Sequence, residues 1–408
     1  MANLSSSNGI EKFPKLRFPE FKEPYRSARL GEIAVLINRT DPKSAAPIMM
    51  LSAGNGFIMQ SDKYSRYNAG QSLKKYILLK KGELAYNHGA SKAKQFGCCY
   101  ELLEDEALIP YVYHCFKVDK NEYTPYVAFL LNNPKIDRQL KRLVSSSARM
   151  DGLLNISFKD YMSINLSLPP YAEQKQVSDF IKRIDERIVI QEQLISSLKK
   201  YKRGSLSVLF PKKREITPQY RFAGFTKPWE QRKLGNCAKF NPKSELPETF
   251  EYVDLESVVE TDIISHRTEI KTSAPSRAQR LAKKGDVFYQ TVRPYQKNNC
   301  IFEKTENNWV FSTGYAQLRP FNDSYFLLTL LQNDNFVKLV LDKCTGTSYP
   351  AINSNDLADI DVSIPIDSKE QQKIGTYFSN LDHLITLHQH KYDILLSLKN
   401  ALLQQMFI

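Results

Sequence analysis

Apolar residues repeat at heptad spacing along two long stretches of the chain, 172–210 and 368–407. In both stretches the steps between seam positions alternate between four and three residues. The first seam consists of Val177, Ile181, Ile184, Ile188, Gln191, Ile195 and Leu198. The second seam consists of Ile374, Phe378, Leu381, Ile385, His388, Tyr392 and Leu395. A seam with this period needs another helix to cover it, so the pattern predicts two long helices that pair with each other. Two unrelated amphipathic surface helices are the alternative, and the equal lengths and registers argue against it.

The two halves of the chain repeat one plan in the same order. The sequence RFPEF at 17–21 recurs as RFAGF at 221–225. Further along, Glu173 corresponds to Glu370 at an offset of 197 residues (370 − 173), and this offset continues through both seams. We therefore interpret the chain as an internal repeat with pseudo-two-fold symmetry.

Each half begins with short alternating strands that are broken by Gly, Pro and Asn, together with some helical stretches. The residues at 286–292 indicate a strand, and those at 325–331 indicate a helix. We predict an α+β chain in which two similar mixed α/β domains are separated by two long antiparallel coiled-coil helices. The predicted segments are a tail (1–13), a first domain (14–170), a central helix (171–210), a linker (211–220), a second domain (221–366) and a distal helix (367–408).

The antiparallel arrangement follows from the short linker. Pro211 ends the central helix, so the second domain must start near that end, and the two domains should lie at opposite ends of the helix pair. Gln191 and His388 occupy equivalent seam positions, 197 residues apart (388 − 191), near the middle of each helix. We expect the two side chains to face each other and to fix the register of the pair. The alternative is that His388 reaches solvent.

Composition narrows the possible partners. The chain has 408 residues, a formal net charge of +13 and 42% hydrophobic residues, which is typical of a globular protein with a polyanionic partner such as nucleic acid. The chain begins without an apolar signal segment and has no run long enough to cross a bilayer. We therefore expect a soluble, cytoplasmic protein without a membrane partner. The six cysteines form no C-x-x-C pair, so we predict neither disulfides nor a metal site.

Catalytic motifs are absent from the sequence. It contains no P-loop for ATP and no Asn/Asp-Pro-Pro-aromatic loop of an amino-methyltransferase. The six His are scattered, and His383, His388 and His390 fall on the second predicted long helix rather than beside a Ser or Cys nucleophile. We predict a protein that is not an enzyme, has no catalytic residues and binds no cofactor of its own.

Recognition chemistry is instead concentrated in one loop of each predicted domain. Arg suits guanine, Asn and Gln suit adenine, and Lys and Tyr suit phosphate. The candidates in the second domain are Gln290, Arg293, Tyr295, Gln296, Lys297 and Asn298, with Arg277, Arg280 and Lys284 as phosphate contacts. The candidates in the first domain are Asn87, His88, Ser91, Lys92 and Lys94. Similar domains with different loops are what two different half-sites would require. The alternative for each residue is an ordinary solvated loop.

Several stretches carry a family resemblance. They are KPWEQRKLG at 227–235, TVRPYQ at 291–296 and STGYA at 312–316 in the second domain, and LPP at 168–170 ahead of Glu173. With these stretches the chain resembles the specificity (S) subunit of type I restriction-modification systems along essentially its whole length. The opening of the first domain departs from the pattern, because YRSARLG at 25–31 replaces the tryptophan-containing sequence.

The resemblance implies two target-recognition domains, each reading one half of a bipartite site in double-stranded DNA. It also implies assembly with two modification subunits, which use S-adenosylmethionine, and with restriction subunits, which use ATP and Mg²⁺ for translocation and cleavage. A stand-alone DNA-binding regulator and a coiled-coil adaptor without a nucleic-acid partner are the rival hypotheses. The sequence does not give the half-sites, because readout depends on loop geometry and DNA deformability as well as residue type.

Overall fold

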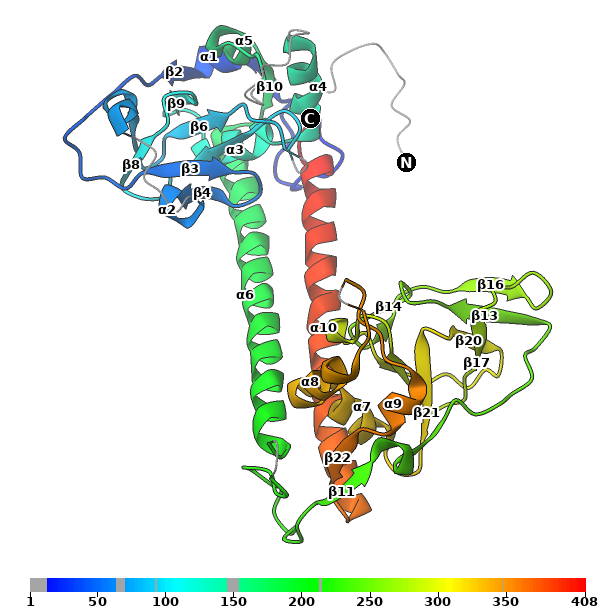
Figure 1. Cartoon of the computed structure of the whole chain (residues 1–408). Coiled ribbons are helices and arrows are strands. Elements are labelled where there is room, and N and C mark those ends of the chain that lie inside the picture. Colours follow the sequence, from blue (N-terminus) through cyan, green and yellow to red (C-terminus); the bar gives the residue numbers. More distant parts are fainter. Residues whose placement is uncertain (1–12, 64–69, 92–93, 145–153, 213–214, 347) are drawn as a thin grey trace. The chain divides into compact units, whose positions relative to one another are not determined.

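The computed structural model describes residues 13–63, 70–91, 94–144, 154–212, 215–346 and 348–408. The chain divides into two compact units (Figure 1). Unit 1 comprises Met1–Ile190 and Tyr392–Ile408, and unit 2 comprises Gln191–Lys391. Both boundaries fall inside long helices, so each unit contains a mixed α/β part and a part of both helices. The predicted division into domains and helices therefore differs from the division into compact units.

The two long helices are α6 (Tyr171–Leu209) and α10 (Ser368–Gln405). Their bounds lie within three residues of those predicted from the heptad pattern. No helix in the described part of the chain is both long enough and apolar enough to cross a membrane.

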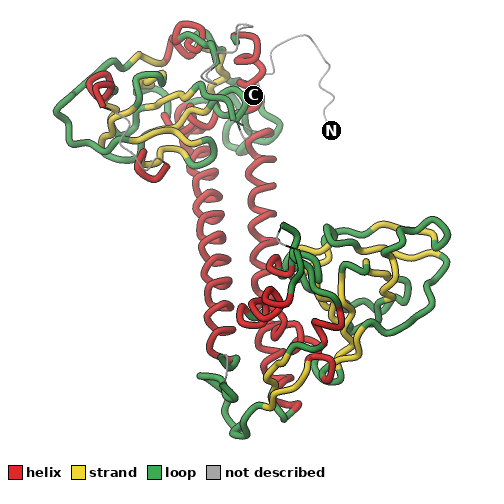
Figure 2. Tube along the Cα trace, in the orientation of Figure 1, coloured by secondary structure: helices red, strands yellow, loops and turns green. Residues whose placement is uncertain are grey.

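The described residues of unit 1 form one four-stranded antiparallel sheet in the order β2-β9-β6-β7 and three two-stranded antiparallel pairs, β1-β10, β3-β4 and β5-β8. Figure 2 shows its short strands connected by long loops. Its strands are β1 (Arg26–Arg29), β2 (Ala34–Leu36), β3 (Met49–Ser52), β4 (Gly56–Met59), β5 (Ile77–Lys80), β6 (Leu84–Asn87), β7 (Cys98–Glu101), β8 (Glu106–Ile109), β9 (His114–Val118) and β10 (Asn165–Leu168). Its shorter helices are α1 (Leu30–Ile33), α2 (Gln60–Lys63), η1 (Gly70–Lys75), α3 (Thr124–Leu131), α4 (Pro134–Leu143) and α5 (Phe158–Met162).

In unit 2 the described residues form two four-stranded sheets, β12-β21-β18-β19 and β16-β13-β20-β17, and two short strand pairs, β11-β22 and β14-β15. The β13-β20 pairing is parallel and the others are antiparallel. The strands are β11 (Glu230–Lys233), β12 (Ala238–Phe240), β13 (Thr249–Val253), β14 (Val258–Val259), β15 (Asp262–Ile263), β16 (Arg267–Ile270), β17 (Ala278–Leu281), β18 (Val287–Gln290), β19 (Cys300–Ile301), β20 (Trp309–Ser312), β21 (Tyr315–Pro320) and β22 (Asp361–Ile364). The shorter helices are η2 (Leu234–Asn236), η3 (Pro294–Gln296), α7 (Ser324–Gln332), α8 (Asp334–Lys343) and α9 (Ser354–Ala358).

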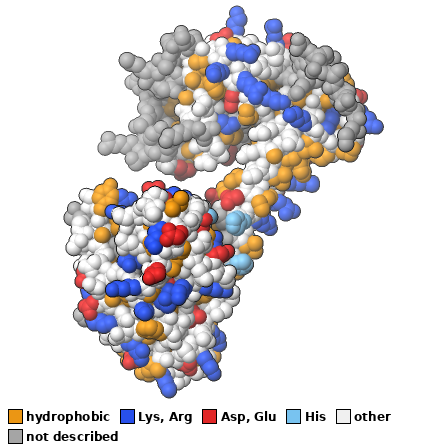
Figure 3. Space-filling model, turned by 90° about the vertical axis from the view of Figure 1, so that its right-hand side faces the viewer, with side chains coloured by type: hydrophobic (Ala, Val, Ile, Leu, Met, Phe, Trp, Pro, Cys, Tyr) orange, Lys and Arg blue, Asp and Glu red, His pale blue; other side chains and the backbone are white. Residues whose placement is uncertain are grey.

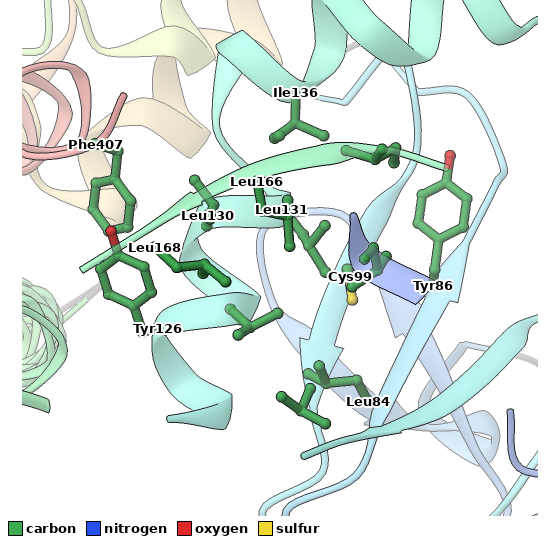
Figure 4. Packing of buried hydrophobic residues seen from close by; sticks show 14 of the residues in the cluster. Leu84, Tyr86, Cys99, Tyr126, Leu130, Leu131, Ile136, Leu166, Leu168 and Phe407 are labelled. Carbon is green, nitrogen blue, oxygen red and sulfur yellow. The ribbon is translucent and has the colours of Figure 1, made fainter. Parts of the chain in front are cut away.

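In unit 1 the end of the chain packs into the main core. Phe407 is fully buried and stacks on Tyr126 of α3, with ring centroids 5.0 Å apart. Figure 4 shows these two rings beside the cluster that contains Leu130 and Leu168. Apolar burial of this kind stabilises a fold by about 25 cal/mol per Å² of apolar surface. The packing therefore joins the segment that follows α10 to the mixed part of unit 1.

Unit 2 makes the corresponding contact at the end of α6. Phe210 stacks on Phe326 of α7, with ring centroids 5.9 Å apart. Phe210 and Phe407 are related by the offset of 197 residues. Residues at equivalent positions of the two halves therefore make equivalent contacts.

A buried carboxylate near the start of each long helix accepts two hydrogen bonds from an arginine. In unit 1, Arg17 bonds to Glu173 through Nε and one terminal nitrogen, both at 2.8 Å, and the Tyr25 hydroxyl donates a third bond at 3.0 Å. Both carboxylates, Glu173 and its counterpart Glu370, are 0% exposed. A buried charge is tolerable only when it is paired and hydrogen-bonded, and this site meets both conditions.

Unit 2 repeats the arrangement with one change. Arg221 donates to Glu370 at 2.6 and 2.7 Å, and the indole nitrogen of Trp229 donates at 3.3 Å. Tyr25 and Trp229 are 204 residues apart (229 − 25), the offset of the RF motifs. The unusual opening of the first domain therefore keeps the hydrogen bond to the carboxylate and changes only its donor.

In unit 2 the parts of α6 and α10 pack against each other in antiparallel directions (Figure 1). Nε2 of Gln191 lies 2.6 Å from Nδ1 of His388, so these two side chains face each other in unit 2. Further along α6, Lys202 pairs with Asp382. As the residue number increases along α6, the number of the contacting residue on α10 decreases, so the two helices run antiparallel.

Unit 1 contains the counterpart of that ion pair, between Lys399 and Asp185. The α6 seam is buried from Val177 to Ile195, and the α10 seam from Ile374 to Ile385. Later α10 seam positions, including His388, are half-buried. The seams predicted from the heptad pattern therefore form the contact between the helices in each unit.

The buried carboxylates lead to a stability prediction. Replacing Glu370 with Gln removes the charge that pairs with Arg221 and leaves the guanidinium without a counterion. We expect the free energy of unfolding to fall by about 3 kcal/mol, the usual cost of breaking a buried pair. Urea denaturation followed by circular dichroism measures the change.

The matched control is Glu192→Gln, which removes the same charge from an exposed position on α6. We expect this control to stay within about 0.5 kcal/mol of the wild-type protein. Equal losses in the two variants would show that the buried pair contributes nothing of its own.

Candidate nucleic-acid interface

The loop after β18 in unit 2 is held in an unusual backbone conformation. Arg293 and Lys297, the residues on either side of η3, both adopt left-handed conformations, with φ of 53° and 57°. Such values are uncommon for residues other than glycine and persist only where the surroundings impose them. Here the amide of Arg293 donates to the carbonyl of Pro350 at 2.8 Å, which holds the loop against a distant segment.

Gln290 shapes this loop from within. Its side chain is 2% exposed and donates to the carbonyl of Val292 at 2.7 Å and to the side-chain oxygen of Gln296 at 2.9 Å. The backbone amide of Gln290 also donates to Asn299. Burial and these bonds argue against the predicted direct contact between Gln290 and nucleic acid. The sequence identified a polar residue of the loop but not that it points inward.

Two further loop residues anchor the loop to neighbouring elements. Lys297 donates to the carbonyl of Gln332 at 2.9 Å and pairs with Asp334, and this hydrogen bond lowers the pKa of the Asp334 carboxyl. Asn298 accepts a bond from the amide of Glu260. The ammonium of Lys297 and the side-chain oxygen of Asn298 are therefore already bonded to other residues of unit 2.

Arg293, Tyr295 and Gln296 remain at the surface of the loop. Tyr295 is 50% exposed and has no hydrogen-bond or ionic partner among the described residues. The guanidinium of Arg293 lies over the ring of Tyr349, with its carbon 4.3 Å from the ring centroid. Tyr349 is 63% exposed and was not predicted, because it lies in a different loop, 56 residues along the chain (349 − 293).

The basic candidates on and beside β17 do not gather at one point. The carbonyl of Arg277 accepts a bond from Thr313, whose neighbour Gly314 is bonded to Thr291 at the start of the β18 loop. Arg277 therefore lies on the loop side of β17. Lys284 follows the other end of that strand and is exposed.

Arg280 lies within β17 and is partly buried. Its Nε is buried without a hydrogen-bond partner, and no carboxylate among the described residues pairs with it. Desolvation lowers the pKa of its guanidinium. A cation that is desolvated but unpaired is poised to bind an anion.

In unit 1 the corresponding loop is also braced from within. His88 is buried, and its two ring nitrogens lie 2.8 and 2.9 Å from the carbonyl oxygens of Leu154 and Val112. The ring also stacks on His114, whose pKa is lowered by burial. The predicted direct contact of His88 is therefore opposed by its burial, as for Gln290.

The remaining candidates of unit 1 are polar and nearer the surface. Asn87 accepts a bond from the amide of Gly89, and exposed Ser91 accepts one from the amide of Lys94. Lys94 donates to the carbonyl of Asn132 at 2.8 Å, at the end of α3, much as Lys297 donates at the end of α7. The predicted contact Lys92 lies outside the described residues.

The described residues contain no group of His, Cys, Asp or Glu that could hold a metal ion. The six cysteines are unpaired thiols, and burial raises the pKa of Cys98 to about 11 and that of Cys115 to about 12. Thiols with raised pKa values are poor nucleophiles and poor metal ligands.

Comparison with known proteins finds a family model that matches much of unit 2. Residues 226–396 match the type I restriction modification DNA specificity domain. The chain is also 26% identical over 140 residues to the specificity subunit of the type I restriction enzyme HindI of Haemophilus influenzae. That match covers 33% of this chain and 30% of the relative, so the chain is aligned with less than a third of the relative's length.

Solved structures resemble the fold over nearly the whole chain. The S subunit of a type I restriction-modification system from M. genitalium is 15% identical with a TM-score of 0.58, and 97% of this chain and 99% of that chain are covered. A chain from a structure concerning complex assembly and conformational transition of the type I R-M system is 17% identical with a TM-score of 0.52, covering 95% and 99%. At these identities the likeness shows the fold alone. It agrees with the predicted plan of two mixed α/β domains joined by long helices.

Proposed function

We propose that this chain, whose residues 226–396 belong to the type I restriction modification DNA specificity domain family, is the DNA specificity subunit of a type I restriction-modification complex. The family match carries the proposal. It covers the part of unit 2 that presents Arg293 on a braced loop and the unpaired Arg280 on the neighbouring strand. The chain recognises DNA and performs no chemistry itself.

Each unit reads one half of a bipartite target in double-stranded DNA. In unit 2 the exposed part of the β18 loop contacts base edges, and Arg277, Arg280 and Lys284 contact phosphates. In unit 1 the polar side chains of Asn87 and Ser91, together with Lys92, serve the same purpose with different chemistry. The buried or tethered candidates hold the loops in shape instead, and they are Gln290, Lys297, Asn298, His88 and Lys94.

The long helices bind two modification subunits through an apolar face. Large apolar side chains are exposed at positions that directly precede a seam position. The seam positions here include the next heptad step beyond the last seam residue named for each helix, positions 202 and 399. In unit 1 they are Phe180, Ile190, Ile394 and Leu398, and in unit 2 they are Leu194, Tyr201, Leu384 and Leu387. Figure 3 shows hydrophobic side chains gathered along the long helices. Exposed apolar patches of this kind mark protein interaction sites.

Within each unit, the geometry of an antiparallel pair brings these residues onto one side. Positions that precede the seam on both helices flank the same side of the pair, and the hydroxyls of Tyr201 and Tyr377 are hydrogen-bonded there at 3.1 Å. The ion pairs Lys202–Asp382 and Lys399–Asp185 follow the other flank. In each unit, the flank that precedes the seams therefore carries exposed apolar side chains, which suits a partner helix.

The chemistry of the complex belongs to the partners. S-adenosylmethionine binds to the modification subunits, and ATP and Mg²⁺ bind to the restriction subunits. This chain recognises the target sequence and binds no cofactor. The complex works in the cytoplasm, where the DNA is.

Co-expression with modification subunits tests the proposed function. We expect the complex to methylate adenines at one bipartite sequence and the isolated chain to methylate and cleave nothing. Mapping of methylated positions in the DNA of the expressing cells gives the result. Tight, sequence-specific binding by the chain alone, without co-purifying subunits, would favour a stand-alone regulator. Salt-insensitive assembly without any DNA preference would favour an adaptor.

The partly buried and unpaired guanidinium of Arg280 yields a quantitative prediction. We expect Arg280→Gln to reduce the slope of log affinity against log salt by about 1, because one phosphate contact and its released counterion are lost. The preferred sequence should stay unchanged. Titrations of the assembled complex with target DNA at several salt concentrations measure the slope.

Arg232→Gln is the control, because Arg232 is paired with Glu230 within unit 2. It should leave the slope unchanged. If the Arg280→Gln complex instead loses its preference at one base pair, Arg280 contacts a base and not a phosphate.

The helix pair is expected to set the length of the spacer between half-sites. Inserting one heptad into both helices at the level of Gln191 and His388 lengthens the pair by about 10 Å, which corresponds to about three base pairs of DNA. The variant complex should prefer a spacer longer by that amount between unchanged half-sites. Methylation mapping measures the spacer, and an unchanged spacer would show that the helices do not determine it.

A further inference from the structure

Two loops of unit 2 that are far apart in sequence form one element. The amide of Arg293 donates to the carbonyl of Pro350 at 2.8 Å, and the amide of Ile352 donates to the carbonyl of Thr291 at 3.0 Å. The second loop is closed by reciprocal backbone hydrogen bonds between Thr345 and Ala351, at 2.9 and 3.0 Å. The position of the β18 loop therefore depends on the segment between α8 and α9.

Tyr349 projects from this second loop onto Arg293. The guanidinium carbon lies 4.3 Å from the ring centroid, within the range of a cation–π contact. Both side chains extend from restrained backbone, since the Arg293 amide is bonded to Pro350, the residue that follows Tyr349. The tyrosine keeps 63% of its surface exposed, so it is not a core residue that meets the arginine by chance of packing.

We propose that Tyr349 is a positioning residue for base readout, which holds the Arg293 guanidinium so that its edge faces two hydrogen-bond acceptors on one base. The inference rests on the proposed function, because it concerns the DNA half-site read by unit 2. The acceptors have the arrangement of N7 and O6 of a guanine.

The chemistry of the guanidinium explains why a ring suits this task. The group is planar, and its five N–H donors all lie in that plane. Stacking uses one face of the plane and leaves the donors at the edge free. It also reduces the number of side-chain rotamers, so less entropy is lost when the arginine meets a base.

Alternative partners for Arg293 are absent from the described residues. No carboxylate among them forms an ion pair with its guanidinium, and no side-chain acceptor is hydrogen-bonded to it. The neighbouring loop residue Lys297 differs, because it is already bonded to Asp334 and Gln332. The contact with Tyr349 is thus what orients the free donors of Arg293.

The test compares Tyr349→Leu, Tyr349→Phe and Arg293→Ala in the complete complex with modification subunits. Each complex is titrated with the mapped target and with duplexes that carry single base-pair substitutions in each half-site. We expect Arg293→Ala to lose roughly tenfold discrimination at one base pair of one half-site. Tyr349→Leu should lose roughly two- to fivefold at the same base pair, and Tyr349→Phe should keep the wild-type preference because it keeps the ring.

The double variant Arg293→Ala/Tyr349→Leu provides a second readout. It should discriminate no worse than Arg293→Ala alone, because the tyrosine acts through the arginine. Tyr220→Leu is the matched control, since Tyr220 is also 63% exposed in unit 2 and has no such contact. It should leave every position unchanged.

Several results would overturn the inference. They are an unchanged preference in Tyr349→Leu or in Arg293→Ala, a uniform loss across all duplexes in Tyr349→Leu, or an equal loss in Tyr349→Phe, which would indicate a hydroxyl contact. Failure of the proposed function has a different signature, because the wild-type complex would then show no sequence preference at all, and the inference would fall with it.

Discussion

A buried carboxylate paired with an arginine near the start of each long helix is the constraint on which the rest of the molecule depends. Glu173 and Glu370 have no exposed surface, and removing a charge from water costs several kcal/mol unless partners compensate it. The compensation comes from residues that precede the mixed α/β part of the same unit, Arg17 with Tyr25 and Arg221 with Trp229. The beginning of each domain is thereby tied to the helix that follows its end.

Further contacts connect each long helix to the candidate recognition loop of a unit. Phe210 and Phe407 continue the connection at the far ends of the helices by stacking on α7 and α3. The same α3 and α7 end at the carbonyls of Asn132 and Gln332, which anchor Lys94 and Lys297 of the two loops. The apolar contacts that fix the helices therefore also support the segments proposed to touch DNA.

Heptad spacing allowed the long helices to be predicted closely, because a seam of period 3.5 depends on local sequence alone. The pairing of Gln191 with His388 followed from the same register. The residues of the candidate nucleic-acid interface were harder to predict from the sequence. Gln290 and His88 have suitable chemistry for DNA but are buried, and burial depends on how strands pack. Tyr349 was missed because backbone hydrogen bonds between distant loops bring it to Arg293.

Nuclease protection of the target DNA by the complete complex tests the central claim most directly. The account predicts two protected segments separated by a weakly protected spacer. Substitutions in the segment read by unit 2 should abolish its protection without changing the bases preferred in the other segment. A single continuous footprint with interdependent preferences, or protection without sequence preference, would contradict the claim that the two units read separate half-sites.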